Sequence, residues 1–285
     1  MRFRLSGRGN GAAQSGHQPI SAMPVTKPAA KASVILTVDD NTLEVENKMT
    51  RNAVLLSLTL IAFVAGTAPA GPMLKLSERQ FDWGRTCQNA TVSHRFWIES
   101  TGDDTLVITK VVPGCGCTRA PLLDSILAPG EKTPLDIFFS TKSYRGKVSK
   151  SPYLETNIGD EKIYLKILSE LSPQPDTLRP IFCNPHKVDV SQFRPNPPRR
   201  IAGFWIHNAG DRDYKITLID HAAEAFEVKL PELVAAGDSV EVKLRVTDES
   251  LEQEFDHSIT FSIDDDSATR YTVPVRRELR YMKDE

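Results

Sequence analysis

Four cysteines are the residues of this 285-residue chain best suited to chemistry. Cys115 and Cys117 flank Gly116 directly after the apolar run Val111-Val112-Pro113, which places them on a loop at the end of a predicted strand. Two thiolates one residue apart can both reach a soft ion such as copper(I) or zinc, with Cys87 as a third ligand. The same pair could instead form a small, strained and easily reduced disulfide, which would make the loop a redox site.

A structural disulfide is the third interpretation of these cysteines. In an oxidising compartment one loop cysteine could pair with Cys87, leaving Cys183 and a spare thiol. Four cysteines allow three complete pairings, and the sequence does not choose between them. The candidate binding or disulfide residues are therefore Cys115, Gly116, Cys117 and Cys87. Copper or zinc is the expected cofactor of the metal-binding alternative, and no cofactor is expected otherwise.

Known catalytic motifs are missing from the sequence. It contains no G-x-S-x-G, no H-E-x-x-H, no glycine-rich phosphate loop and no C-x-x-C. The histidines share no metal-ligand spacing, and His94 lies on an apolar strand face, which favours a packed histidine over a ligand. Asp264-Asp265-Asp266 is typical of a solvated hairpin turn. We therefore expect a protein that is not an enzyme.

Two tryptophans are candidates for an interaction surface. Trp97 follows the core-facing Phe96, and Trp205 follows Phe204 in the same local pattern. Alternation along a strand puts each tryptophan on the face opposite its phenylalanine. The two rings are covered by neighbouring strands, or they are exposed aromatic anchors for a partner.

Composition and charge narrow the class of protein. The 35 Lys+Arg residues nearly balance the 37 Asp+Glu residues, and no run of five or six like charges occurs. A nucleic-acid partner is therefore not expected. Forty per cent hydrophobic residues are sufficient for one or two cores.

A secretory signal is predicted at residues 49–70. A basic stretch at 48–52 precedes the uncharged run Ala53–Ala65, and Thr67-Ala68-Pro69-Ala70 supplies the small residues read by a signal peptidase. The apolar run is shorter than the roughly 20 residues of a membrane span. We expect a mature chain from Gly71 with no transmembrane span, located in the periplasm or outside the cell. Residues 1–48 are interpreted as a mis-annotated or disordered leader.

An internal repeat follows the signal. Residues 94–103 return as 202–211, 127–131 match 234–238, and 81–83 match 188–190, all in the same order. Two tandem copies of about 100 residues are a common domain size. We predict one domain at 71–172, a linker with three prolines at 173–182, and a diverged second domain at 183–279.

Each copy shows the two-residue period of β-strands, with turn signals between the runs. Val92, His94, Phe96 and Ile98 share one face of a strand, and Ile259, Phe261 and Ile263 do so in the second copy. Long helical periodicity is missing after residue 70. Short strands at this spacing predict an all-β chain of two tandem immunoglobulin-like (Ig-like) β-sandwiches.

Several motifs of the first copy carry a family resemblance. They are Phe81-x-Trp83-Gly84, His94-x-Phe96, Thr101–Ile108, Cys115-Gly116-Cys117-Thr118 and Ala128-Pro129-Gly130-Glu131. In this order they resemble the bacterial family called domain of unknown function 1573, over roughly residues 73–170. The second copy is similar to the wider group of Ig-like domains of sperm-protein and cilium-associated proteins. The resemblance implies an exported Ig-like protein of a family without an assigned activity.

The sequence thus predicts an exported, non-catalytic module for protein interaction or scaffolding in the bacterial cell envelope. Its partners are expected to be other envelope proteins or peptides, bound through strand edges or end loops. The alternative is a soft-metal or thiol-redox protein that uses the Cys115/Cys117 loop. Partner identity, oligomeric state and disulfide connectivity do not follow from the sequence.

Overall fold

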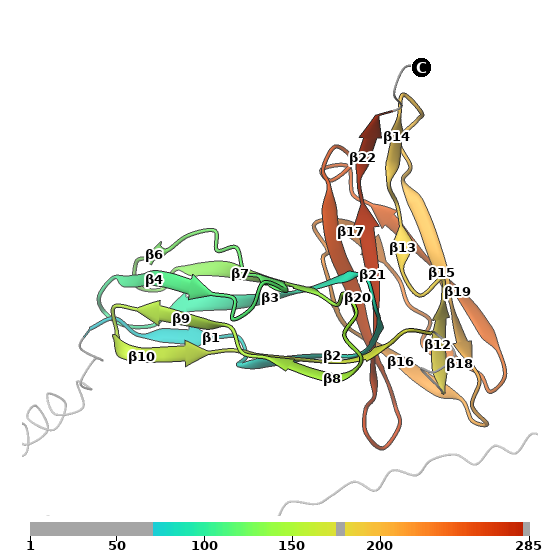
Figure 1. Ribbon diagram of the computed structural model, residues 1–285, viewed down its shortest axis with the longest axis horizontal. Coiled ribbons are helices and arrows are strands. Elements are labelled where there is room, and N and C mark those ends of the chain that lie inside the picture. Colours follow the sequence, from blue (N-terminus) through green and yellow to red (C-terminus); the bar gives the residue numbers. More distant parts are fainter. Residues whose placement is uncertain (1–70, 175–179, 282–285) are drawn as a thin grey trace, which may run out of the picture. The chain divides into compact units, whose positions relative to one another are not determined.

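All regular structure in the described part of the chain is β-strand (Figure 1). The computed structural model describes residues 71–174 and 180–281. The predicted all-β, Ig-like fold is confirmed over these residues, and within them no helix is long and apolar enough to span a membrane. The predicted leader at 1–48 and signal peptide at 49–70 lie outside the described residues.

The first half of the fold is a two-layer sandwich. One layer is a sheet of order β1-β3-β7-β5, and β10-β9-β4-β6 forms the facing sheet, with β2, β11 and β8 beside it. Phe96, Ile98, Leu135 and Ile137 are buried between the layers. The strands are β1 (Leu74–Leu76), β2 (Gln80–Cys87), β3 (Thr91–Ser100), β4 (Leu106–Val112), β5 (Thr118–Arg119), β6 (Ile126–Leu127), β7 (Lys132–Ser140), β8 (Gly146–Lys150), β9 (Tyr153–Thr156), β10 (Gly159–Tyr164) and β11 (Lys166–Ser172).

The second half repeats the strand order of both sheets. Its order β12-β15-β19-β17 corresponds to β1-β3-β7-β5, and β21-β20-β16-β18 corresponds to β10-β9-β4-β6. The internal repeat in the sequence is therefore a repeat of strand pairing. The strands are β12 (Ile181–Asn184), β13 (Val188–Asp189), β14 (Gln192–Arg194), β15 (Ile201–Asn208), β16 (Tyr214–His221), β17 (Phe226–Val228), β18 (Leu233–Val234), β19 (Ser239–Val246), β20 (Phe255–Ile263), β21 (Arg270–Arg277) and β22 (Leu279–Tyr281).

The two halves share one sheet. Strand β2 pairs in parallel with β21 at Arg85 and Tyr271, which joins the halves in the order β18-β16-β20-β21-β2-β11-β8. The buried side chains form two hydrophobic clusters, one in each half, yet the described residues all fall within one compact unit. The proposed domain boundaries at 71–172 and 183–279, and the linker at 173–182, stay predictions.

Close backbone contact at this joint depends on a glycine. Gly84 has φ +62°, a left-handed conformation, and a Cβ at this position would collide with the backbone carbonyl of Arg270. Glycine is therefore required where β2 approaches β21. The Phe81-x-Trp83-Gly84 motif thus contributes two buried aromatic rings to the core and the glycine that allows β2 to pack closely against β21.

Candidate functional site

The two loop cysteines form a disulfide with each other. They lie between β4 and β5, after a turn in which Gly114 has φ +82°. Cys115 is half-buried, Gly116 is exposed, and Cys117 is buried in the first core. The Thr118 hydroxyl lies 3.3 Å from Cys115 Sγ and 3.9 Å from Cys117 Sγ. The loop therefore contains one partly exposed cysteine and one buried cysteine.

Cys87 takes no part in this loop. It ends strand β2, is buried, and donates its thiol to the His186 carbonyl over 3.5 Å. Burial raises the pKa of Cys87 and, more strongly, that of Cys183, so both thiols are poor nucleophiles. The suggested bridge from the loop to Cys87 is not formed, because Cys115 and Cys117 pair with each other and Cys87 is a free thiol.

The suggested soft-metal site does not fit the residues present. A disulfide sulfur is not the thiolate that copper or zinc requires. In residues 71–174 and 180–281 no three His, Cys, Asp or Glu side chains are grouped so that they could hold a metal ion. Cys115, Cys117 and Cys87 therefore do not form a common ligand set.

This disulfide closes a very short loop, which limits its effect on stability. In the chain-entropy account, a bridge stabilises a fold by constraining the unfolded chain, and more so for longer loops. A loop of three residues gives about 1.6 kcal/mol, against about 3 kcal/mol for fifteen residues. A pairing across the fold would stabilise the protein more than this one does.

Both candidate tryptophans are exposed on equivalent strands. Trp97 on β3 and Trp205 on β15 each expose 44% of their surface, while Phe96 and Phe204 beside them are buried. The expected alternation of inward phenylalanine and outward tryptophan is therefore present in both halves. Of the two rings, Trp97 borders a hollow between the halves.

That hollow, called the junction hollow below, has a volume of about 250 Å³. Its walls come from β3 and β7 of the first half and from β16, β20 and the turn after β16 of the second half. Acidic and basic side chains line it together with the edge of Trp97. They are Arg95, Asp136, Asp220, Glu224, His94, His221 and His257, and Ser93 and Phe138 are among the other lining residues.

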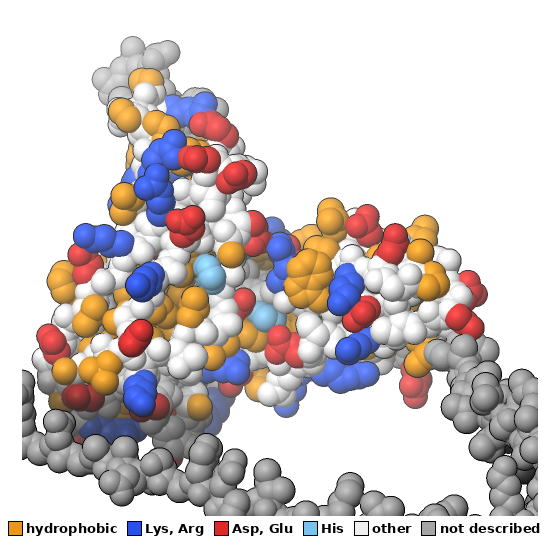
Figure 2. Space-filling model, turned by 180° about the vertical axis from the view of Figure 1, so that it is seen from behind, with side chains coloured by type: hydrophobic (Ala, Val, Ile, Leu, Met, Phe, Trp, Pro, Cys, Tyr) orange, Lys and Arg blue, Asp and Glu red, His pale blue; other side chains and the backbone are white. Residues whose placement is uncertain are grey.

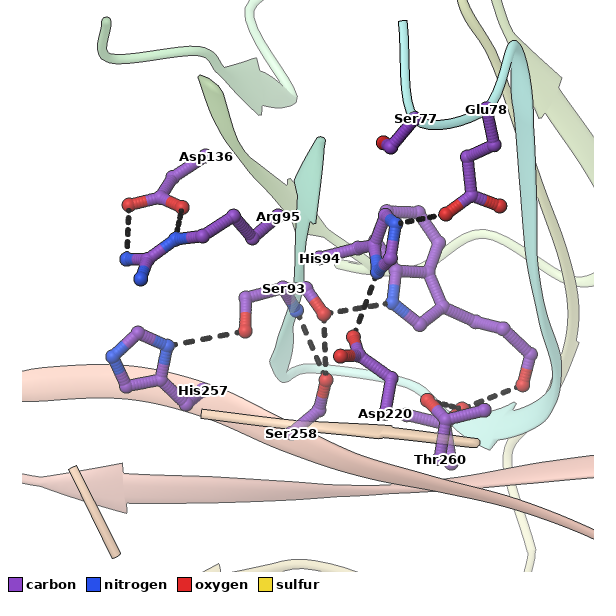
Figure 3. Close-up of polar contacts among 12 residues, drawn as sticks. Ser77, Glu78, Ser93, His94, Arg95, Asp136, Asp220, His257, Ser258 and Thr260 are labelled. Carbon is purple, nitrogen blue, oxygen red and sulfur yellow. Dashed lines mark hydrogen bonds and ion pairs between the residues drawn. The ribbon is translucent and has the colours of Figure 1, made fainter. Parts of the chain in front are cut away.

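Arg95 connects both walls of the junction hollow. Its guanidinium donates to both carboxylate oxygens of Asp136, at 2.6 and 2.9 Å (Figure 3). The guanidinium also lies 2.8 Å from a carboxylate oxygen of Glu224. The hydrogen bond with Asp136 is the main reason that the pKa of Arg95 is raised. Because Arg95 and Asp136 belong to the first half and Glu224 to the second, this ion cluster joins the halves.

His94 makes a second polar connection. Its Nδ1 lies 2.7 Å from Asp220 of the second half, and its Nε2 lies 2.9 Å from Glu78 (Figure 3). The ring stacks on Phe81 at a centroid distance of 3.6 Å. Burial alone would lower the pKa of His94, but the hydrogen bonds to Asp220 and Glu78 outweigh it and raise that pKa. The histidine is packed, as the sequence predicted, and it is also an ionic bridge.

Ser93 and His257 form a pair that sequence motifs did not reveal. Ser93 Oγ lies 3.1 Å from His257 Nδ1, and the Ser258 hydroxyl bonds both the backbone N–H and the carbonyl of Ser93 (Figure 3). Ser93 is only 8% exposed, and burial lowers the pKa of His257. In the described part of the chain no carboxylate is hydrogen-bonded to His257. The pair lacks the third, orienting group of a catalytic triad.

The surface in Figure 2 mixes acidic, basic and apolar side chains and shows no large patch of one charge sign. Together, the two-layer strand order and its repetition around a second core define a protein of the Ig-like β-sandwich class.

Within that class, residues 74–171 match the family described as "Protein of unknown function (DUF1573)". The resemblance carried by the motifs of the first copy is thereby confirmed over this segment. No curated protein matches the chain.

Solved structures with similar folds are distant. A protein of unknown function from Porphyromonas gingivalis W83 is 14% identical, covering 73% of this chain and all of that chain, with a TM-score of 0.30. The PapD-like domain 7 of human CEP192 is 11% identical, covering 39% of this chain and 92% of that chain, with a TM-score of 0.32. A chimeric titin Z1Z2 is 11% identical, covering 75% and 100%, with a TM-score of 0.26. At these TM-scores the fold assignment rests on the strand order itself.

Proposed function

We propose that this chain is an exported, non-catalytic Ig-like protein that binds other proteins or peptides of the bacterial cell envelope. The observation that carries the proposal is the exposed ring of Trp97 at the edge of the junction hollow. Large aromatic side chains next to a charged recess are typical anchors of protein interfaces, because they combine apolar area with nearby polar contacts.

The surroundings of Trp97 support this role. The ring also borders a shallow hollow lined by Lys75, Leu76, Glu99 and Lys132. A partner segment on Trp97 would thus meet an apolar anchor flanked by charges of both signs. Residues of both halves line the junction hollow. The contacts of Arg95 with Glu224 and of His94 with Asp220 hold the two walls of the hollow in position.

The disulfide supports the exported location. Disulfides form and persist in oxidising compartments and are rare in the reducing cytosol. A Cys115–Cys117 bridge in the folded chain is consistent with a periplasmic or extracellular protein, as is the signal peptide predicted at 49–70.

Photo-crosslinking in intact cells tests the proposed surface. A benzoyl-phenylalanine placed at Trp97 is expected to give a discrete crosslinked band with an envelope protein. The same residue at Trp205 is the matched control, because the two positions are equally exposed on equivalent strands. A band of the same partner and yield at both positions, or at neither, would contradict an interface at Trp97.

A further inference from the structure

The two cysteines of the disulfide loop differ in their exposure to solvent. Cys115 is half-buried at the rim of the first core, whereas Cys117 is 6% exposed and packs within it. Gly116 between them is exposed, and apart from the two cysteines no described residue comes within 4 Å of the place where a Cβ would be. An incoming thiol can therefore approach the loop from solvent and reach Cys115 first.

The backbone on both sides of the bridge is anchored. The Ser140 N–H donates to the Cys117 carbonyl at 2.8 Å, and the Thr118 N–H donates to the Cys115 carbonyl at 3.2 Å. Opening the S–S bond would leave the backbone of both cysteines in place, because these contacts do not depend on it. The Thr118 hydroxyl faces both sulfurs and can donate a hydrogen bond to whichever carries negative charge.

From this arrangement we infer that the Cys115–Cys117 bridge is a thiol–disulfide exchange site for accessible thiols of exported proteins, with Cys115 as the sulfur attacked. This inference is independent of the proposed surface at Trp97. The short loop agrees with it, since the bridge contributes less to folding than a longer-range pairing would.

The exchange balances without another reactant. A substrate thiolate attacks Cys115 Sγ, the S–S bond breaks, and its electron pair stays on Cys117 Sγ, which takes up the proton released by the substrate thiol. The product is a mixed disulfide at Cys115 and a thiol at Cys117. A second substrate thiol attacks the substrate sulfur of that mixed disulfide, so the substrate leaves oxidised and Cys115 becomes a thiol.

Trapping with reduced glutathione tests the inference on the full folded chain. After acid quenching and alkylation, fragment masses of the peptide between Lys110 and Arg119 locate the adduct. We expect glutathione at Cys115 in excess over Cys117 by on the order of tenfold, as access predicts. The buried thiols of Cys87 and Cys183 should stay unmodified and thereby report that the protein is folded.

Two results would overturn the inference: an adduct mainly on Cys117, or an intact bridge in excess glutathione while Cys87 and Cys183 remain protected.

A pair of variants tests the contribution of the Thr118 hydroxyl to the exchange. Thr118→Val keeps the shape and is expected to slow adduct formation several-fold, whereas Thr118→Ser should keep the rate. An unchanged rate of adduct formation in Thr118→Val would show that the Thr118 hydroxyl does not assist the exchange.

Discussion

At the scale of single residues, His94 gives the clearest link between structure and solution behaviour. A neutral imidazole carries one N–H and can donate to one carboxylate, whereas the imidazolium donates to both. Glu78 and Asp220 both lie within hydrogen-bond distance of the ring, so the structure favours the charged form. Arg95, Asp136, Glu224, His221 and His257 are the other charged or titratable groups of the adjoining hollow.

We therefore predict that protonation of His94 stabilises the fold at low pH. Because its folded pKa is raised above the unfolded value of about 6.5, this contribution is complete below that pH and is lost as pH rises through the folded pKa. His94→Gln should cost about 1.5–3 kcal/mol at acidic pH and less at alkaline pH. Denaturant unfolding at both pH values measures the difference, and an equal loss at both would contradict the ionic bridge.

These residue contacts mark the limit of the sequence prediction. The period-two pattern placed His94, Trp97 and Trp205 on the correct strand faces, because alternation is a local property of a strand. The partners of His94 are 16 and 126 residues away, and no local pattern encodes such pairs. The bridge between Cys115 and Cys117 was among the open pairings, but only the folded loop selects it.

At the scale of elements, a buried arginine holds the end of strand β21. Arg277 is 1% exposed and donates to the carbonyls of Val190, Arg199 and Leu251, at 2.8, 3.1 and 2.6 Å. Three separate segments thus meet at one guanidinium. This role could not be predicted from the sequence, because Arg276 and Arg277 are adjacent and alike in type.

Replacing this arginine should destabilise the second half strongly. Arg277→Met leaves buried carbonyls without donors and is expected to cost about 3–5 kcal/mol of unfolding free energy. Arg276→Met is the matched control, because the Arg276 side chain is 54% exposed and its ion pairs lie at the surface, where about 1 kcal/mol or less is expected. Chemical denaturation measures both losses of unfolding free energy. Equal losses in Arg277→Met and Arg276→Met would contradict a stabilising role of the buried Arg277 contacts.

At the scale of the whole molecule, the two cores are connected by buried polar contacts as well as by the shared sheet. Thr272 Oγ1 donates to the Trp83 carbonyl at 2.6 Å, and Thr86 Oγ1 donates to the Thr272 carbonyl at 2.7 Å. Ser258 bonds both backbone groups of Ser93. The sequence predicted two copies and a linker, and the repeat was visible because strand patterns recur. The contacts that join the copies do not recur and were not predictable.

We predict that the two cores unfold together while this joint is intact. The double variant Thr272→Val and Ser258→Ala leaves buried carbonyl and N–H groups at the joint unpaired, so calorimetry should show two separate transitions. Thr247→Val is the control, because the Thr247 hydroxyl bonds the Glu224 and Ala225 carbonyls within the second half. Two transitions already in the unaltered protein would contradict a coupled unit.

The central claim is that Trp97 contacts a partner protein, whereas the equally exposed Trp205 does not. Oxidative footprinting of the tryptophans in intact cells tests it most directly, because the three tryptophans act as mutual controls. In the purified protein Trp97 and Trp205 should be oxidised equally and Trp83 should be protected, as their exposures of 44%, 44% and 0% dictate. In cells the account predicts that Trp97 becomes protected while Trp205 stays reactive. Equal oxidation of Trp97 and Trp205 in cells would contradict it.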